Sequence, residues 1–145
     1  MRKKIVFLLA FLCMLLLVGC SNGKETSKYN IGYLNKDKTG IVAVPYDASA
    51  TTKDALIEEF FAALSSDPDN VEYRKPIPND VEITKYSLDG ALLTIYFDAD
   101  YLNMKEVEEV LCRAAVVRTM TQISGIDCVL SLIHISEPTR LALIS

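Results

Sequence analysis

The segment that decides the fold reads Val81-Glu82-Ile83-Thr84-Lys85-Tyr86-Ser87-Leu88-Asp89-Gly90-Ala91-Leu92-Leu93-Thr94-Ile95-Tyr96-Phe97. Apolar and polar residues alternate through 81–86, which is the period of a strand with one buried face. Asp89-Gly90 is a tight-turn dipeptide, and residues 91–97 are rich in the aliphatic and aromatic residues that strands favour. We predict a β-hairpin here, the clearest element of the chain.

A second hairpin is predicted upstream. Residues 29–34 and 41–46 are short strand-like runs, and the polar segment 35–40 between them closes on Gly40. Two such runs joined by a Gly-containing turn are typical of antiparallel strands. The chain is therefore expected to contain two hairpins, one near each end of its central region.

The first helix is predicted after this hairpin. Thr51 and Asp54 approximate a capping box. A wide apolar stripe then recurs at helical spacing, with Glu58 and Glu59 on the other side. Its members are Leu56, Ile57, Phe60, Phe61 and Leu64. Such a stripe favours packing against a sheet.

The second helix is predicted to begin at Asn103, which has Glu106 three residues later. Ser124-Gly125 ends it. The apolar positions expected to face the core are Val107, Val110, Leu111, Ala114, Val117 and Thr121.

These elements define the expected fold. Residues 65–78 contain three prolines and are predicted to form a loop, and residues 126–129 begin a last strand. The order is β-β-α-β-β-α-β. We predict a single small α+β domain, with a mostly antiparallel sheet covered on one face by two helices.

The N-terminus predicts export and lipid attachment. A basic start, Arg2-Lys3-Lys4, precedes an apolar run at 5–17 that is too short for a spanning helix of about 20 residues. The run ends in Leu17-Val18-Gly19-Cys20, which resembles the signal of a bacterial lipoprotein. That resemblance implies cleavage after residue 19, a diacylglyceryl thioether on Cys20, a tether over 20–28, and the outer face of the bacterial cytoplasmic membrane. An ordinary signal peptide or a signal anchor is the alternative.

The C-terminus carries a different signal. Residues 130–140 resemble the translation of a transposase-type sequencing adapter, and Ile144-Ser145 fit its continuation. We expect residues 130–145 to be foreign, although Leu130 to Ile133 are strand-compatible. The alternative is a genuine strand, a proline turn and an apolar tail. The only histidine, His134, lies in this segment.

Charge excludes one class of partner. The chain has 15 basic and 19 acidic residues; the signal holds three of the basic ones, and the tail holds one of each sign. The remainder has 11 basic and 18 acidic residues, a formal charge of −7. An acidic domain of this kind does not bind phosphate backbones through counterion release, so we expect no nucleic-acid partner.

Reactive side chains form no recognisable catalytic or metal site. Cys112 and Cys128 have no neighbouring CxxC motif, which leaves burial or a disulfide as their roles. Asp98 and Asp100 would share a strand face, but no third ligand follows at a recognisable spacing. Glu106, Glu108 and Glu109 suit the first turns of a helix. We expect neither an enzyme, nor a cofactor, nor a metal site.

Several further segments together point to a family. They are residues 41–45, 55–64, 77–81, 88–95, 98–102 and 117–127. Because of these segments, residues 29–129 resemble a GerMN domain, the module of sporulation and spore-germination lipoproteins. The family's closing strand with its Asp-Gly turn is replaced by residues 130–145. The resemblance implies a role in sporulation or germination and allows for a second copy of the domain.

The expected function is protein contact at the cell envelope. Tyr73 and Arg74 lie in the irregular loop, and these residue types are enriched at binding hot spots; they are the candidate contact residues. The resemblance implies assembly of an envelope complex. The alternative is a general envelope lipoprotein that binds a wall polymer or a small ligand, and a hydrolase is the least favoured class.

Overall fold

The computed structural model describes residues 27–133. Its elements are β1 (Tyr29–Asn35), β2 (Ile41–Tyr46), α2 (Lys53–Ser65), β3 (Tyr73–Arg74), β4 (Ile83–Asp89), β5 (Leu92–Phe97), the 3-10 helix η1 (Ala99–Asn103), α3 (Glu106–Met120) and β6 (Cys128–Ile133). The predicted α+β class and the order of the main elements are confirmed. The short elements β3 and η1 are additions.

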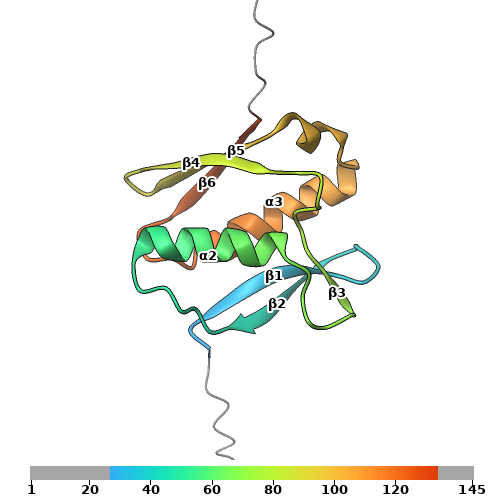
Figure 1. The fold of residues 1–145 in the computed structure, drawn as a ribbon, viewed down its shortest axis with the longest axis horizontal. Coiled ribbons are helices and arrows are strands. Elements are labelled where there is room, and N and C mark those ends of the chain that lie inside the picture. The colour runs from blue at the N-terminus through green and yellow to red at the C-terminus, as the bar shows by residue number, and fades with distance from the viewer. Residues whose placement is uncertain (1–26, 134–145) are drawn as a thin grey trace, which may run out of the picture.

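The domain has three layers, with the two helices between two sheets (Figure 1). One sheet has the order β2-β1-β3 and is antiparallel. The other has the order β4-β5-β6, in which β6 runs parallel to β5. The predicted single sheet with helices on one face is therefore corrected, because each hairpin belongs to a sheet of its own.

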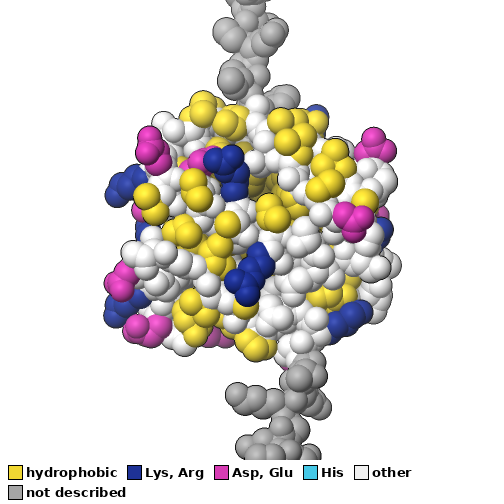
Figure 2. Space-filling model, turned by 180° about the vertical axis from the view of Figure 1, so that it is seen from behind, with side chains coloured by type: hydrophobic (Ala, Val, Ile, Leu, Met, Phe, Trp, Pro, Cys, Tyr) yellow, Lys and Arg dark blue, Asp and Glu magenta, His cyan; other side chains and the backbone are white. Residues whose placement is uncertain are grey.

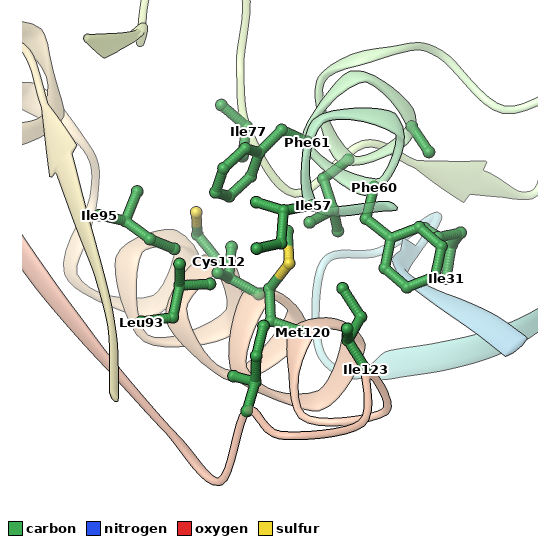
Figure 3. Packing of buried hydrophobic residues seen from close by; sticks show 14 of the residues in the cluster. Ile31, Ile57, Phe60, Phe61, Ile77, Leu93, Ile95, Cys112, Met120 and Ile123 are labelled. Carbon is green, nitrogen blue, oxygen red and sulfur yellow. The ribbon is translucent and has the colours of Figure 1, made fainter. Parts of the chain in front are cut away.

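Neighbouring aromatic residues of α2 explain the two sheets. The Phe60 ring meets Tyr29 and Tyr46 of the first sheet, at centroid distances of 5.2 and 6.0 Å. The Phe61 ring meets Tyr86 of the second sheet at 5.6 Å. In Figure 3 the two phenylalanines diverge, Phe60 toward Ile31 of β1 and Phe61 toward the other side. The wide stripe on α2 thus serves two interfaces.

Side chains of α3 and of the turn that follows it cover an open edge of β1. Strand β1 pairs with β3 only at its last two residues, so polar backbone groups further along that edge need other partners. The Gln122 amide accepts a hydrogen bond from Asn30 N (2.9 Å) and donates one to Asn30 O (2.7 Å). Thr119 Oγ1 accepts one from Gly32 N at 3.0 Å. These contacts fix α3 against the first sheet.

Gly32 allows α3 to approach β1 closely. A Cβ atom at this position would lie 3.2 Å from Ala115 O and 3.3 Å from Thr119 Oγ1. Both helix residues are small and fully buried. The inner face of α3 is therefore the one on which Ala115 and Thr119 permit this close approach.

Both predicted hairpins are confirmed. Residues of β1 and β2 pair from Tyr29 with Tyr46 to Leu34 with Ile41. In the second hairpin, Asp89 pairs with Leu92, and Gly90 between them has a φ of +58°. That left-handed conformation favours glycine, so the turn predicted from Asp89-Gly90 lies where expected.

The helix starts differ slightly from the predicted ones. Thr52, not Thr51, caps α2, and its Oγ1 accepts a hydrogen bond from Ala55 N at 3.4 Å. Helix α3 begins at Glu106 without a side-chain cap. Asn103 instead ends η1, where its amide donates to Asp100 Oδ1 at 3.2 Å.

The predicted core stripe of α3 is wrong except at Leu111, which is half-buried. Val107, Val110 and Val117 are exposed by 63, 56 and 41 %, and Ala114 and Thr121 are also exposed. The buried residues of α3 are Cys112, Ala115, Val116, Thr119 and Met120. The reason is the close packing at Gly32, which places Ala115 and Thr119 of α3 against β1.

Candidate functional site

The predicted lipid attachment lies outside the described residues. Leu17, Val18, Gly19 and Cys20 all precede residue 27, and the anchor stays a prediction. Among residues 27–133, no helix combines the length and the apolar character needed to cross a bilayer.

Tyr73 and Arg74, the predicted contact residues, form β3 at the edge of the first sheet. Tyr73 is half-buried and packs against the core, so it is less exposed than the loop assignment implied. Arg74 Nη1 donates hydrogen bonds to Val71 O at 2.7 Å and to Tyr73 O at 2.8 Å. The guanidinium therefore orders its own loop.

The loop around β3 is further fixed by lysine contacts. Lys75 Nζ donates to Asn79 Oδ1 at 2.6 Å and forms an ion pair with Asp67 at 3.1 Å. Lys36 pairs with Glu72 at 3.3 Å. What this loop offers to a partner is chiefly Val71, which is exposed by 73 %.

The carboxylates of Asp98 and Asp100 have different surroundings. Asp98 Oδ1 is buried without a hydrogen-bond partner, whereas Asp100 is exposed and accepts from Asn103. No group of three potential ligands converges among residues 27–133. The two carboxylates therefore occupy separate surroundings after β5.

The two cysteines also lie apart. Cys112 is buried and Cys128 is exposed, and both are free thiols. Burial raises the pKa of Cys112 to about 12, and Glu109 adds to the shift. At neutral pH the Cys112 thiol is protonated and therefore a poor nucleophile. Burial, one of the two predicted roles, applies to Cys112 alone.

Glu59 has a structural role that the sequence did not reveal. Its carboxylate accepts hydrogen bonds from Ser49 N (2.9 Å), Ala50 N (2.7 Å) and the Tyr46 hydroxyl (3.0 Å). The backbone hydrogen bond from Ser49 is the largest cause of a lowered Glu59 pKa. Glu59 thereby ties the segment after β2 to α2.

Hollows in the surface are small or open. The cleft between α3 and β6, lined by Arg113, Val117 and Val129, has a volume of about 50 Å³. A groove of about 360 Å³ near Tyr29 and Thr51 is open to solvent. Small-ligand sites bury most of the ligand in a cavity of about 300–1,000 Å³, and neither hollow combines that volume with enclosure.

The outer face of α3 is the apolar surface that sequence analysis missed. Val107, Val110 and Val117 account for three of the seven exposed large apolar residues in the described chain, and none lies on α2. Figure 2 shows the side of the molecule opposite to Figure 1, where hydrophobic side chains surround two basic groups. The sequence did contain the pattern of this surface, since these valines belong to the stripe that was wrongly assigned to the core.

A family model described as "Germane: Sporulation and spore germination" matches residues 31–130. The chain belongs to the Germane family. The match covers both hairpins, both helices and the start of β6, so the predicted resemblance is confirmed. The family is linked to sporulation and spore germination, a process rather than a reaction. No curated protein sequence matches the chain significantly.

Solved structures support the fold. The first GerMN domain of the sporulation protein GerM from Bacillus subtilis has a TM-score of 0.61 and 17 % identity, over 79 % of this chain and 88 % of that one. The tandem GerMN domains of the same protein have a TM-score of 0.59 and 18 % identity, over 72 % of this chain and 38 % of that one. A candidate lipoprotein from Clostridium perfringens has a TM-score of 0.50 and 16 % identity, over 79 % of each chain.

These similarities show a shared GerMN fold. This chain spans 38 % of the tandem structure, which contains two such domains. At 16–18 % identity, the roles of the related proteins do not transfer directly.

Proposed function

We propose that this chain is a lipid-anchored extracytoplasmic interaction module that supports sporulation or spore germination by assembling an envelope complex. The family match over residues 31–130 carries the proposal. The partner is a protein of the envelope, and the membrane is contacted through the lipid on Cys20.

The anchor is supported by the sequence before the domain. Leu17-Val18-Gly19-Cys20 follows the apolar run directly, and a fold relative from Clostridium perfringens is itself described as a candidate lipoprotein. A flexible tether of eight residues has an end-to-end distance of roughly 15 Å. The domain would then stay close to the outer face of the cytoplasmic membrane.

A contact role is supported by the exposed side chains. The buried cysteine, the separated aspartates and the shallow hollows give no support to catalysis, whereas the outer face of α3 presents an apolar surface. Tyr73 and Arg74 are retained as a second contact candidate at the edge of the first sheet.

We also propose that residues 130–145 are foreign. The family match ends at residue 130, one residue beyond the proposed junction. Leu130 to Ile133 complete β6 beside β5, in keeping with their strand-compatible types. Reading the intact gene past the codon for Val129 tests this: a match to the adapter base for base supports it, and unrelated synonymous codons contradict it.

The anchor is tested with Cys20→Ala in a spore-forming bacterium. We expect loss of fatty-acid labelling, poor processing of the precursor and reduced sporulation or germination, because the domain is no longer held at the membrane. Cys128→Ser is the matched control and should retain labelling. Labelling of Cys20→Ala at the wild-type level would contradict lipid attachment.

The envelope role is tested separately by crosslinking. Under sporulation conditions the lipidated chain should be recovered with a defined envelope protein or with a second copy. Normal sporulation and germination after deletion of the gene would contradict the proposed role while leaving the anchor unaffected.

A further inference from the structure

The exposed apolar residues of α3, together with Thr121 at its C-cap, form a regular seam. Their spacing alternates between three and four residues along four turns of helix, which is the spacing of the apolar positions in a helix pair. The seam consists of Val107, Val110, Ala114, Val117 and Thr121. Isolated exposed apolar residues are ordinary, but a seam of this period is a surface on which helices pack.

The domain's own core does not use this seam. The buried face of α3 is centred on Cys112, Val116 and Thr119. Residues five positions apart are separated by roughly 140° around a helix, so Val107 and Cys112 point to different sides. The seam is free for contact outside the domain.

We propose that α3 packs antiparallel against α3 of a second copy of this chain through this seam. This inference rests on the proposed function, because it takes the domain to act by protein contact. It adds that the partner is a second copy of the chain. With a two-fold axis near residue 112, Val107 faces Val117 of the second copy. Val110 then faces Ala114 of the second copy.

The size of the side chains fits this register. A two-fold interface uses one self-complementary surface twice. Here each Ala114 lies opposite a valine, so a small residue accommodates a large one and the helices approach closely. At each end of the interface, Val107 of one copy lies opposite Val117 of the other. Four pairs of facing residues therefore form the interface, all from positions 107, 110, 114 and 117.

Charge also favours antiparallel pairing. The first turns of α3 contain Glu106, Glu108 and Glu109, whereas Arg113 and Arg118 lie in its second half. An antiparallel pair places the acidic half of each helix along the basic half of the other, whereas a parallel pair aligns like charges. Two of these acidic groups already have partners in their own chain: Glu109 pairs with Arg113 at 2.7 Å, and Glu108 pairs with Lys38 at 3.1 Å. The charges left for the second copy are therefore those of Glu106 and Arg118.

The interface is small, and the membrane compensates for this. One helix pair falls at the low end of interface sizes, which is typical of weak, transient contacts. Proteins held on one membrane meet at a much higher effective concentration than in solution. Dimerisation is therefore expected for the anchored chain in membranes.

The register is tested by disulfide trapping in membranes. Two differently tagged full-length chains are co-expressed, both carrying Cys128→Ser to remove the exposed thiol and both keeping Cys20. One carries Val110→Cys and the other Ala114→Cys; both positions are exposed, so folding is retained. Because a disulfide needs Cα atoms within about 7 Å, we expect the mixed dimer to form at least about fivefold faster than either same-site dimer.

The control replaces Ala114→Cys in one chain with Val71→Cys, at a position that is exposed by 73 % but lies near β3; no rapid mixed dimer is expected. Equal rates for all pairs, no trapped dimer, or a dominant dimer between two copies of Val110→Cys would overturn the proposal. Trapping of a different envelope protein at position 114 would overturn the second copy as partner, yet would support the proposed function.

Discussion

The two helices of this domain use similar apolar content in opposite ways. In α2, every member of the predicted stripe from Leu56 to Leu64 is buried. In α3, three valines of the predicted stripe are exposed, and a different face that runs from Cys112 to Met120 is buried instead. Both helices lie between the same two sheets (Figure 1).

The difference follows from how closely each helix approaches its sheet. Phe60 and Phe61 fill the space on either side of α2, whereas Gly32 draws α3 against β1 through Ala115 and Thr119. The whole predicted apolar stripe of α2 stabilises the core, whereas α3 contributes a different face that includes Val116 and Met120, and its three exposed valines are left for contact. Substitutions on the two helices should therefore have different effects.

Phe60→Ala should have the largest effect. Removal of this fully buried ring leaves a cavity between α2 and the first sheet, and we expect a loss of about 3–5 kcal/mol in the free energy of unfolding. Urea denaturation measures it. A midpoint close to that of the wild type would show that α2 does not anchor the core.

Thr119→Val should have the next largest effect. It keeps the shape of the side chain but leaves Gly32 N without its acceptor, and an unsatisfied buried donor costs about 1–3 kcal/mol. Thr121→Val on the exposed side of the helix end is the matched control, expected to change stability by less than about 0.5 kcal/mol. Equal losses for the two variants would contradict the role of Thr119.

Glu59→Gln should alter the response to acid. Hydrogen bonds from Ser49, Ala50 and Tyr46 lower the pKa of Glu59, so its contribution is present above the ordinary value of about 4.3 and is lost as pH falls through the folded-state pKa. We expect urea midpoints of variant and wild type to differ at pH 7 and to converge near pH 3. The control Glu82→Gln changes an exposed glutamate and should alter stability at pH 7 by less than about 0.5 kcal/mol; a difference for Glu59→Gln that stays constant with pH would contradict the linkage.

Val110→Ala should have the smallest effect on stability, below about 0.5 kcal/mol. Val116→Ala is the matched substitution on the opposite face of α3, where the side chain is buried. It removes two buried methyl-sized groups and should cost about 1.5 kcal/mol. If the two valines cost the same in urea denaturation, the assignment of inner and outer faces is wrong.

The sequence predicted the elements with local signals and missed those set by distant contacts. Alternation and Asp89-Gly90 determine the second hairpin, and the stripe of α2 has a single apolar arc. Helix α3 has apolar residues on two of its faces. The face containing Ala115 and Thr119 is buried because of Gly32, which lies more than eighty residues upstream, and no local pattern shows this. The split into two sheets was missed for the same reason, since it depends on Phe60 and Phe61 facing apart.

The candidate site was predictable only in part. Tyr73 and Arg74 were chosen by residue type, but the half-burial of Tyr73 and the hydrogen bonds of Arg74 to its own loop depend on β3 pairing with β1. The seam on α3 was visible as a pattern, and its exposure was not. Cys20 lies before the described residues, so its role rests on sequence alone.

The most direct test of contact through α3 is site-specific photo-crosslinking in the membrane of intact cells. A photoreactive residue replaces Val110 in the full lipidated chain, and replaces Val71 in a parallel strain. We expect the probe at position 110 to join two copies of the chain, with the attachment mapping to residues 113–115 of the second copy, and the probe at position 71 to give no such product. No product at position 110, or the same product from both positions, would contradict contact through α3.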